Sequence, residues 1–370
     1  MQIAHLLGSL NRGGAEISVL DVFKNLKDSE FGIIGIHRKK GALINDFYKS
    51  EKRMYKIQPN ALFDLFYFIK LRRLIKKENV QILHSHQVLD AILAYISTIG
   101  MSVKIVLTFH GYLLGHNFVQ RYMRHYIIKR TSLNLFVSNA LKEYYLIKYL
   151  DIKKEQQQVL YNGISFDKLN IDSNYSLRKE LKIDNDTLLL GFVGSFTSVR
   201  DHLTICNFLL LLKKEDIPFK FIFIGGKSNA EYWLYDNCYN FCIDNGLSRH
   251  VEFLGVRNDV PLILKELDSF VYSTERDTFG IAVVEAMAAA IPVFVNDWEV
   301  MLEITKNGKY ATVYKTKDEE DLLNKFLDFL SNRDKYKSKA IESSKFVRSK
   351  FSIENHISNL TNIYKNILKT

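Results

Sequence analysis

Cysteine and proline are scarce in this chain, and long apolar runs are absent. The 370 residues include three cysteines and four prolines. Three cysteines do not make a disulfide framework, which favours a reducing compartment. No run approaches the roughly 20 apolar residues of a membrane-spanning helix, and the N-terminus lacks the basic flank and cleavage site of a signal peptide. We therefore expect a cytoplasmic protein.

Two short patterns resemble metal-binding motifs but lack what a metal site requires. Cys238 and Cys242 are spaced to meet on one helix face, but no second ligand pair follows them, which argues against a zinc site. Asp184 and Asp186 form a D-x-D pattern in a polar turn, where such residues are expected without a metal. We expect no metal and no cofactor.

Positive charge is concentrated in the first half of the chain. Of the 51 Lys and Arg residues and the 41 Asp and Glu residues, 24 and 12 lie within residues 1–165. This half therefore has a net charge of +12, and the remainder has −2. The asymmetry favours a polyanionic or membrane-surface partner, with an ordinary solvated surface as the alternative. Nucleic acid is not expected, because no nucleic-acid-binding signature accompanies the basic residues.

Strand and helix patterns alternate throughout, which indicates an α/β protein with largely parallel sheets. Strands are predicted at 2–7, 32–37, 80–84, 104–109, 133–137, 158–161, 187–193, 219–224, 251–254, 269–272 and 291–295. The predicted helices include 15–26, 61–77, 91–99, 202–214, 230–245, 261–266, 319–332 and 335–368.

The alternation predicts two doubly wound, Rossmann-like domains that face each other across a cleft, with ligands beyond the carboxyl ends of the strands. We place the first domain at residues 1–175 and the second at 176–350. Residues 351–370 are expected to form a helix that returns towards the first domain.

The segment from Asp277 to Glu285 is the most informative part of the chain. It follows the predicted strand 269–272, has Phe279-Gly280 just after the first carboxylate, and continues in a helix-favouring run. A glycine-relieved loop at a helix N-terminus presents N–H groups that favour anions and hydroxyl-rich ligands. Glu285 lies one to two turns into this helix, within reach of the same ligand. We interpret the pattern as a sugar-nucleotide site.

Residues 8–14 form a second glycine-rich loop between a predicted strand and a predicted helix. Gly13 and Gly14 would let a diphosphate approach the backbone closely at the helix N-terminus; a tight turn without a ligand is the alternative. The G-x-G-x-x-G and P-loop patterns are absent, so a redox cofactor is not expected.

These motifs are part of an ordered set that resembles a known family. The set comprises Gly13-Gly14-Ala15-Glu16, Ile82-Leu83-His84-Ser85-His86, Thr108-Phe109-His110-Gly111, Val137-Ser138, Tyr161-Asn162-Gly163-Ile164, Val193-Gly194, Arg200-Asp201-His202, Phe253 to Val260, and Asp277 to Glu285. In order and spacing it resembles the retaining glycosyltransferases of group 1 (sucrose-synthase-like), which have the GT-B fold and include enzymes of bacterial surface-polysaccharide synthesis. The resemblance spans nearly the whole chain.

The resemblance implies a role for each motif around a nucleotide-diphosphate sugar. Arg200 would stabilise the leaving diphosphate, and Glu285 would accept hydrogen bonds from the ribose hydroxyls. The backbone at Val256-Arg257 would read the nucleobase, with a surface loop as the alternative.

Other residues are expected at the transferred sugar. Asp277 would face that sugar together with the amides of Phe279 and Gly280. His110, in front of a glycine at the end of a strand, would contact the sugar or the diphosphate near the reacting carbon; a buried structural histidine is the alternative.

His84 and His86 are two residues apart on a predicted strand, so both point to one face. That spacing permits a metal, but the sequence offers no third ligand, so we expect structural or acceptor-side roles.

Two positions depart from the family pattern. The family usually has Glu where this chain has Asp277, which makes donor-sugar choice less predictable than nucleotide binding. It usually has Arg directly after Val-Gly, where this chain has Ser195, and its second cation is usually Lys, where this chain has Arg200. We expect Arg200 to carry a larger share of diphosphate binding.

The activity implied is hexosyl transfer, with retention and without a metal, from a UDP- or GDP-sugar to a saccharide or lipid-linked oligosaccharide in capsule, O-antigen or lipopolysaccharide synthesis. A non-catalytic sugar-nucleotide or polysaccharide-binding protein and a GT-B enzyme of another type, such as a sugar-nucleotide epimerase, are the alternatives.

The basic first half would bind the acceptor. Residues 62–77 combine an apolar body with a basic end, and Arg121, Arg124, Lys129 and Arg130 follow in the same half. We expect peripheral attachment to the anionic inner face of the plasma membrane, with an ordinary helix packed on the sheet as the alternative.

Overall fold

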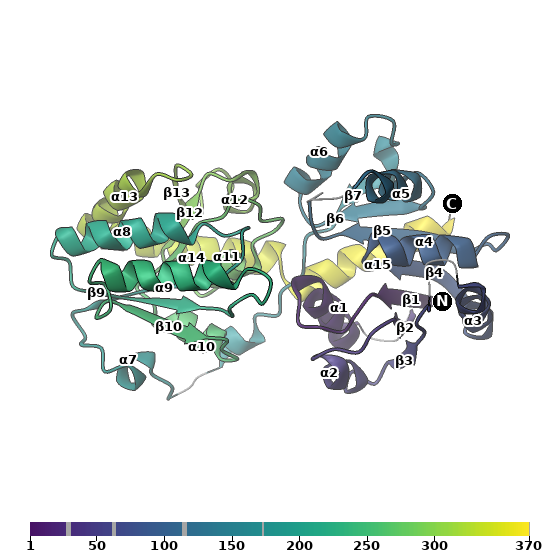
Figure 1. Ribbon diagram of the computed structural model, residues 1–370, viewed down its shortest axis with the longest axis horizontal. Helices are drawn as coiled ribbons and strands as arrows, with labels where there is room; N and C mark the ends of the chain where they lie inside the picture. Colours follow the sequence, from purple (N-terminus) through teal and green to yellow (C-terminus); the bar gives the residue numbers. More distant parts are fainter. Residues whose placement is uncertain (27–30, 61–63, 113–116, 172–173, 370) are drawn as a thin grey trace. The chain divides into compact units, whose positions relative to one another are not determined.

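The computed structural model describes residues 1–26, 31–60, 64–112, 117–171 and 174–369 (Figure 1). The chain forms two compact units, each built around one sheet. Unit 1 comprises Met1–Ile164 and Ile353–Thr370, and unit 2 comprises Ser165–Ser352. Every strand pairing in both sheets is parallel, as the alternating pattern predicts. No helix among the described residues is long and apolar enough to cross a membrane.

Unit 1 contains a seven-stranded sheet in the order β3-β2-β1-β4-β5-β6-β7. Its strands are β1 (Gln2–Leu7), β2 (Gly32–His37), β3 (Arg53–Lys56), β4 (Val80–Ser85), β5 (Lys104–Phe109), β6 (Leu133–Phe136) and β7 (Gln157–Val159). Its helices are α1 (Gly14–Asn25), α2 (Ile44–Tyr48), α3 (Leu65–Lys77), α4 (Val88–Ser97), α5 (Phe118–Ile128), α6 (Asn139–Lys148), the 3-10 turn η1 (Lys154–Gln156) and α15 (Ile353–Lys369).

Helices cover both faces of this sheet, so its central strands are apolar on both sides. On one face, Ile3 and Leu7 of β1 pack with α1 and with Leu360 and Ile367 of α15. On the other face, Ala4 and Leu6 pack with α3 and α4. Alternate residues of β1 thus enter different cores.

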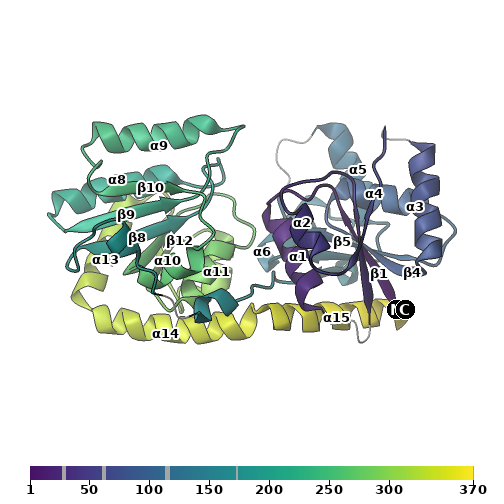
Figure 2. The same cartoon turned by 90° about the horizontal axis from the view of Figure 1, so that it is seen from below.

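Unit 2 contains a six-stranded sheet in the order β10-β9-β8-β11-β12-β13. Its strands are β8 (Leu188–Val193), β9 (Phe219–Ile224), β10 (Val251–Gly255), β11 (Ser269–Tyr272), β12 (Val293–Asn296) and β13 (Thr312–Tyr314). Its helical segments are η2 (Asp167–Asn170), α7 (Leu177–Glu180), α8 (His202–Lys214), α9 (Tyr232–Asp244), α10 (Val260–Glu266), α11 (Ile281–Ala288), α12 (Glu299–Thr305), α13 (Glu319–Ser331) and α14 (Arg333–Lys350). Figure 2 shows α8 and α9 on one side of the sheet and α11 and α14 on the other.

The division between the units falls at Ile164–Ser165, earlier than the predicted boundary after residue 175. The reason is local packing, because η2 and α7 both contact α10 of unit 2. The predicted helix at 335–368 is two helices, and the second, α15, packs beside α1 in unit 1.

Burial of α15 in unit 1 predicts a stability cost for a core truncation there. Leu360 is buried among residues of β1 and α1, so Leu360→Ala should lower the free energy of unfolding of this unit by about 2–5 kcal/mol. Urea denaturation, monitored by far-UV circular dichroism, measures this free energy of unfolding. Leu150→Ala, at an exposed position of the same unit, should stay within about 0.5 kcal/mol of the unsubstituted protein. Equal effects of the two substitutions would show that α15 does not dock as described.

Candidate functional site

The order of the second sheet changes direction between β8 and β11, and the loops after these two strands meet. Arg200 lies in the loop after β8, and Asp277 lies in the loop after β11. A backbone bridge joins Arg200 to Thr274. The Arg200 Nη1 atom lies 3.3 Å from Asp277 Oδ2. Two residues predicted for the diphosphate and the sugar are therefore in direct contact at the carboxyl ends of the strands, where ligands of such sheets bind.

Asp277 is buried, and both of its carboxylate oxygens have partners. Its Oδ1 accepts hydrogen bonds from the backbone N–H groups of Thr278 and Phe279, at 2.8 and 3.3 Å. Its Oδ2 accepts one from the Tyr272 hydroxyl at 2.6 Å, next to the ion pair with Arg200. Asp277 thus shapes its own loop and orients Arg200.

The Arg200 guanidinium is held from several sides. It lies 5.2 Å from the centre of the Tyr272 ring, and its Nη1 donates to the Thr274 hydroxyl at 3.4 Å. Its Nε is buried without a hydrogen-bond partner among the described residues. A buried donor of this kind is costly unless it is paired. The side chain is 19% exposed, so part of the cation is open to solvent.

Gly280 connects this loop to α11. It has φ +79°, in the left-handed region, and a Cβ atom there would lie 2.7 Å from Met301 Cε. The left-handed backbone conformation favours glycine, whereas the end of the flexible Met301 side chain could move aside. Glu285 follows in the second turn of α11 and is half-buried.

The Phe279 amide is used differently from the sequence prediction. Its N–H donates to Asp277, and its buried ring packs edge-on against Phe351. Contact of this amide with a sugar would require the bond to Asp277 to break. The predicted sugar contact of the Gly280 amide stays a prediction.

Glycines line the same sheet edge at the ends of β8, β9 and β10. A Cβ atom on Gly225 would lie 2.0 Å from the Gly194 carbonyl oxygen, so the first two loops touch. Ser195 is exposed directly after Gly194. Gly255 has φ +64°, and Val256 next to it is 68% exposed.

The Arg257 side chain is committed to its own surroundings. It forms ion pairs with Glu180 and Asp259 at 2.8 and 2.7 Å and donates to the Tyr175 hydroxyl. Only the backbone of the Val256-Arg257 pair therefore remains for the predicted contact with a nucleobase.

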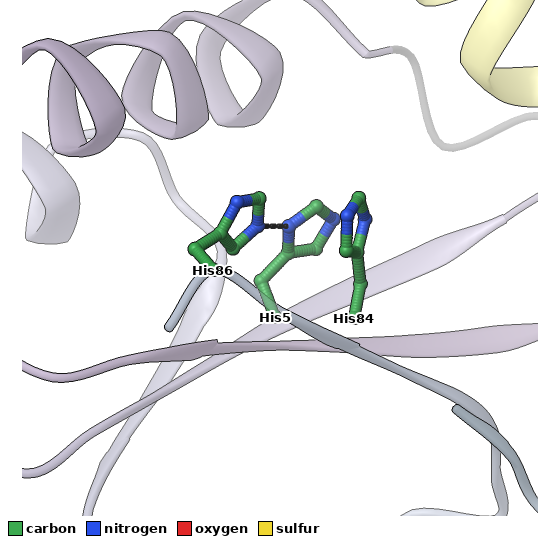
Figure 3. Close-up of side chains that lie close together, drawn as sticks. All are labelled: His5, His84 and His86. Carbon is green, nitrogen blue, oxygen red and sulfur yellow. Dashed lines mark hydrogen bonds between the residues drawn. The ribbon is translucent and has the colours of Figure 1, made fainter. Parts of the chain in front are cut away.

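Histidines fill the corresponding edge of unit 1. His84 and His86 lie on the same face, as their spacing predicts, with ring centres 4.4 Å apart. Figure 3 shows His5, from the adjacent strand β1, beside both of them. The His5 and His86 rings are hydrogen-bonded between Nδ1 and Nε2 at 3.0 Å, and His86 Nδ1 lies 3.2 Å from Nε2 of His110.

The contacts continue into a hydrogen-bonded chain that ends at β5. The Tyr364 hydroxyl of α15 lies 3.2 Å from His5 Nε2 and 2.6 Å from His84 Nδ1. His84 Nε2 lies 2.6 Å from the Thr108 hydroxyl. A neutral imidazole has one donor and one acceptor, as a hydroxyl does, so the chain from Thr108 to His110 is satisfied when every ring is neutral.

Burial keeps these rings neutral. Burial, followed by the nearby His356, lowers the pKa of His5 to about 3 and that of His110 to about 4. The pKa values of His84 and His86 are also well below the ordinary value, chiefly because of burial. His110 is therefore a neutral group at the edge of the sheet, suited to hydrogen bonding and not to carrying charge.

His5 is a third potential metal ligand that the sequence did not reveal, because it comes from a different strand. The ligand atoms of His5, His84 and His86 lie within 4.8 Å of one another. However, Tyr364 and Thr108 occupy both ring nitrogens of His84, and the cavity that the cluster lines is only about 20 Å³. This favours the structural or acceptor-side interpretation over a metal.

An acid, Glu16 in the first turn of α1, reaches the end of the predicted diphosphate loop of unit 1. Gly13 precedes α1, and a Cβ atom there would lie 2.5 Å from Glu16 Oε2. The carboxylate of Glu16 thus offsets part of the positive potential at this helix N-terminus. Diphosphate binding at Gly13 and Gly14 stays a prediction, and the structure favours Arg200 as the stronger anion site.

The histidine chain predicts that stability falls at acidic pH. A histidine with a lowered folded-state pKa is fully stabilising above its unfolded value of about 6.5, and this stability is lost as pH falls towards the folded value. Each such ring contributes up to about 1.4 kcal/mol per pH unit. The free energy of unfolding from urea titrations should therefore decrease steeply between pH 6.5 and 4.5, and less steeply in His5→Gln. Identical slopes would contradict the neutral cluster.

Comparison with known proteins identifies the class. The family described as "Glycosyltransferase Family 4" matches residues 12–168, and the family described as "Glycosyl transferases group 1" matches residues 174–345. The chain is 24% identical to an uncharacterised glycosyltransferase of Methanocaldococcus jannaschii, over 96% of this chain and 95% of the relative. It is also 24% identical to the UDP-Gal:alpha-D-GlcNAc-diphosphoundecaprenol alpha-1,3-galactosyltransferase of Escherichia coli, over 88% and 86% of the two chains.

Solved structures support the same fold. Anabaena HepE in complex with UDP and glucose superposes with a TM-score of 0.87, covering 99% of this chain and 100% of HepE at 17% identity. The lipopolysaccharide glycosyltransferase WaaG superposes with a TM-score of 0.72, at 14% identity and with 98% and 99% coverage. Two parallel Rossmann-like sheets and two matched families lead to one conclusion: the chain belongs to the group 1 glycosyltransferases of GT-B fold.

Proposed function

We propose that this chain transfers a hexose from a UDP- or GDP-sugar to a hydroxyl of a saccharide or lipid-linked oligosaccharide, with retention and without a metal, in surface-polysaccharide synthesis. The observation that carries the proposal is the placement of Arg200. A partly exposed guanidinium with an unpaired Nε lies between the loops after β8 and β11, fixed by Asp277 and Tyr272. Such a group suits a departing diphosphate.

A UDP-sugar is the favoured donor. The named galactosyltransferase of Escherichia coli uses UDP-Gal, and HepE was crystallised with UDP and with UDP-glucose. In our proposal Glu285 accepts hydrogen bonds from the ribose hydroxyls, because it lies on the helix that starts at the same loop. The exposed backbone at Val256 is the proposed base contact.

In the proposed reaction the bond between the anomeric carbon and the diphosphate oxygen breaks, and the acceptor oxygen bonds to the same face of the sugar. The proton of the acceptor hydroxyl passes to the departing diphosphate. Arg200 stabilises the charge that develops on the leaving group, and neutral His110 orients a sugar or acceptor hydroxyl. Catalysis then rests on orientation and charge stabilisation. Asp277 acts mainly through Arg200, as its contacts suggest.

Two other functions give different products. A non-catalytic binding protein would bind the sugar nucleotide without turnover, and an epimerase would convert it without releasing nucleoside diphosphate. Purified protein, radiolabelled UDP- or GDP-sugars and bacterial lipid extract decide between them. Release of nucleoside diphosphate matched by label in an acceptor supports transfer, and either alternative result overturns it. The same assay with EDTA should retain its rate, because no metal takes part in the proposed transfer step.

Substitutions at the site should separate chemistry from nucleotide binding. Arg200→Ala should lower kcat by about 10²–10³-fold, because a donor to the leaving group is lost. Glu285→Ala should instead weaken UDP binding by about tenfold or more, measured by calorimetry, since it removes two charge-assisted hydrogen bonds.

Arg249→Ala is the matched control for Arg200. Arg249 is exposed just before β10, at the amino ends of the strands and away from the proposed site. Its loss should leave kcat within about twofold. Equal kcat values for Arg200→Ala and Arg249→Ala would remove Arg200 from the mechanism.

We also propose that α3 attaches the protein to the anionic inner face of the plasma membrane. Residues 62 and 63 of the predicted amphipathic segment lie outside the described residues. Within α3, Tyr67, Leu71 and Ile75 pack inward. Its outer side exposes apolar and basic residues together, namely Leu65, Phe66, Ile69, Lys70, Arg73, Lys76 and Lys77. An apolar and basic surface of this kind suits anionic lipid headgroups.

Vesicle sedimentation tests the membrane proposal. The protein should bind phosphatidylglycerol vesicles more than phosphatidylcholine vesicles, and binding should weaken with salt. Phe66→Ala combined with Lys70→Ala should reduce binding several-fold. Leu203→Ala, at an exposed position of unit 2, serves as the control. No preference for anionic vesicles, or no effect of the double substitution, would reject attachment through α3.

A further inference from the structure

All three cysteines of the chain meet at one place. Cys206 lies on α8, and Cys238 and Cys242 lie on α9, which packs beside α8 (Figure 2). All three are buried, and their sulfur atoms lie within 4.8 Å of one another. The Cys206 and Cys238 sulfurs are 3.1 Å apart. The 370 residues contain no other cysteine, so the whole thiol content of the protein is concentrated between two helices.

The sequence shows only half of this arrangement. Cys238 and Cys242 are one helical turn apart and share a face, but no second cysteine pair exists. The third sulfur comes from the neighbouring helix and completes a three-thiol set. Three thiolates on two facing helices are a suitable ligand set for a thiophilic metal ion.

An alternative explanation is that cysteine fills small apolar spaces in cores. This explains why the cysteines are buried but not why they meet, because a cysteine that only fills space gains nothing from contact with other cysteines. The chain fills other buried positions of α8 with ordinary core residues such as Ile205, Phe208 and Leu209.

A cavity provides access to the cluster. It has a volume of about 690 Å³, and its lining includes Cys206, Cys238, His202 and Asn237. His202 lies one turn before Cys206 on α8, and its buried Nε2 has no hydrogen-bond partner among the described residues. An ion therefore has a route of entry and room for a fourth ligand.

We propose that Cys206, Cys238 and Cys242 bind one Zn²⁺ ion that joins α8 to α9, with the fourth position open to the cavity. Each bond formed between sulfur and zinc replaces an S–H bond, and the proton is released to solvent. None of the three ligands is a residue proposed for sugar transfer, so the site is structural or regulatory, although Arg200 also lines the cavity to which it opens.

The histidine cluster of unit 1 is a weaker candidate for the same ion. Its ring nitrogens are already paired in a chain that includes Tyr364 and Thr108. The thiols of unit 2 have hydrogen bonds only with one another among the contacts described here. The two clusters also differ in ligand type, so a spectroscopic probe distinguishes them.

The test uses the full chain, reduced and stripped of metal. One equivalent of Zn²⁺ should bind by equilibrium dialysis with elemental analysis, and it should raise Tm. Titration with Cd²⁺ should produce thiolate-to-metal charge-transfer absorption that saturates at one ion per chain. Each of Cys206→Ser, Cys238→Ser and Cys242→Ser should abolish the absorption and weaken Zn²⁺ binding by about 100-fold or more.

Two matched variants guard against misinterpretation. Asn237→Ala alters the cavity lining but keeps all three thiols, and His86→Gln alters the histidine cluster; both should retain one equivalent of Zn²⁺. Cys→Ala variants repeat the test should a serine variant fail to fold. The proposal is overturned by no charge-transfer absorption, by absorption that survives Cys206→Ser, by loss of zinc in His86→Gln, or by a Cys206–Cys238 disulfide in the freshly isolated protein.

Discussion

Parallel pairing of every described strand is the constraint on which the rest of this protein depends. Because all strands of a sheet run the same way, their carboxyl ends share one edge, and every loop that carries chemistry opens there. In unit 2 this brings Arg200 and Asp277 into contact although 76 positions separate them in the sequence. In unit 1 it brings His5, His84 and His110 together from three strands. The helices on both faces keep the central strands dry and rigid, so these loops have fixed starting points.

Asp277 stands where the family usually has Glu, and its contacts in the structure suggest what the shorter side chain does. A longer side chain would not fit the same set of short contacts to Tyr272, Thr278 and Arg200 without moving the loop. The shorter side chain of Asp277 therefore fits an arrangement in which its carboxylate forms an ion pair with Arg200. Ser195 supplies no second cation, so the position of Arg200, set by Asp277, Tyr272 and Thr274, becomes more consequential. In the proposed reaction, specificity for the sugar would depend on how this loop is held as much as on direct contact.

The sequence predicts the elements with a clear periodic pattern and the motifs within them. It does not reveal the edge strands or the clusters that form through tertiary contacts. The strands 2–7, 32–37, 104–109 and 219–224 are confirmed, because buried parallel strands are continuous apolar runs. The short edge strands β3 and β13 were missed, since their exposed faces dilute the pattern. The spacing of His84 and His86 correctly placed them on one face. His5, Tyr364 and Cys206 were not recognised as cluster members, because they join through tertiary contacts between elements distant in sequence.

The return of α15 to unit 1 has a consequence for folding during synthesis. This helix follows the whole of unit 2 in the chain, yet it covers residues of β1 and α1, which precede unit 2. During translation the face of unit 1 that α15 covers therefore stays uncovered while unit 2 is synthesised. Tyr364 can join the histidines only after α15 has left the ribosome, so the histidine edge is assembled only on polypeptides that extend through this helix.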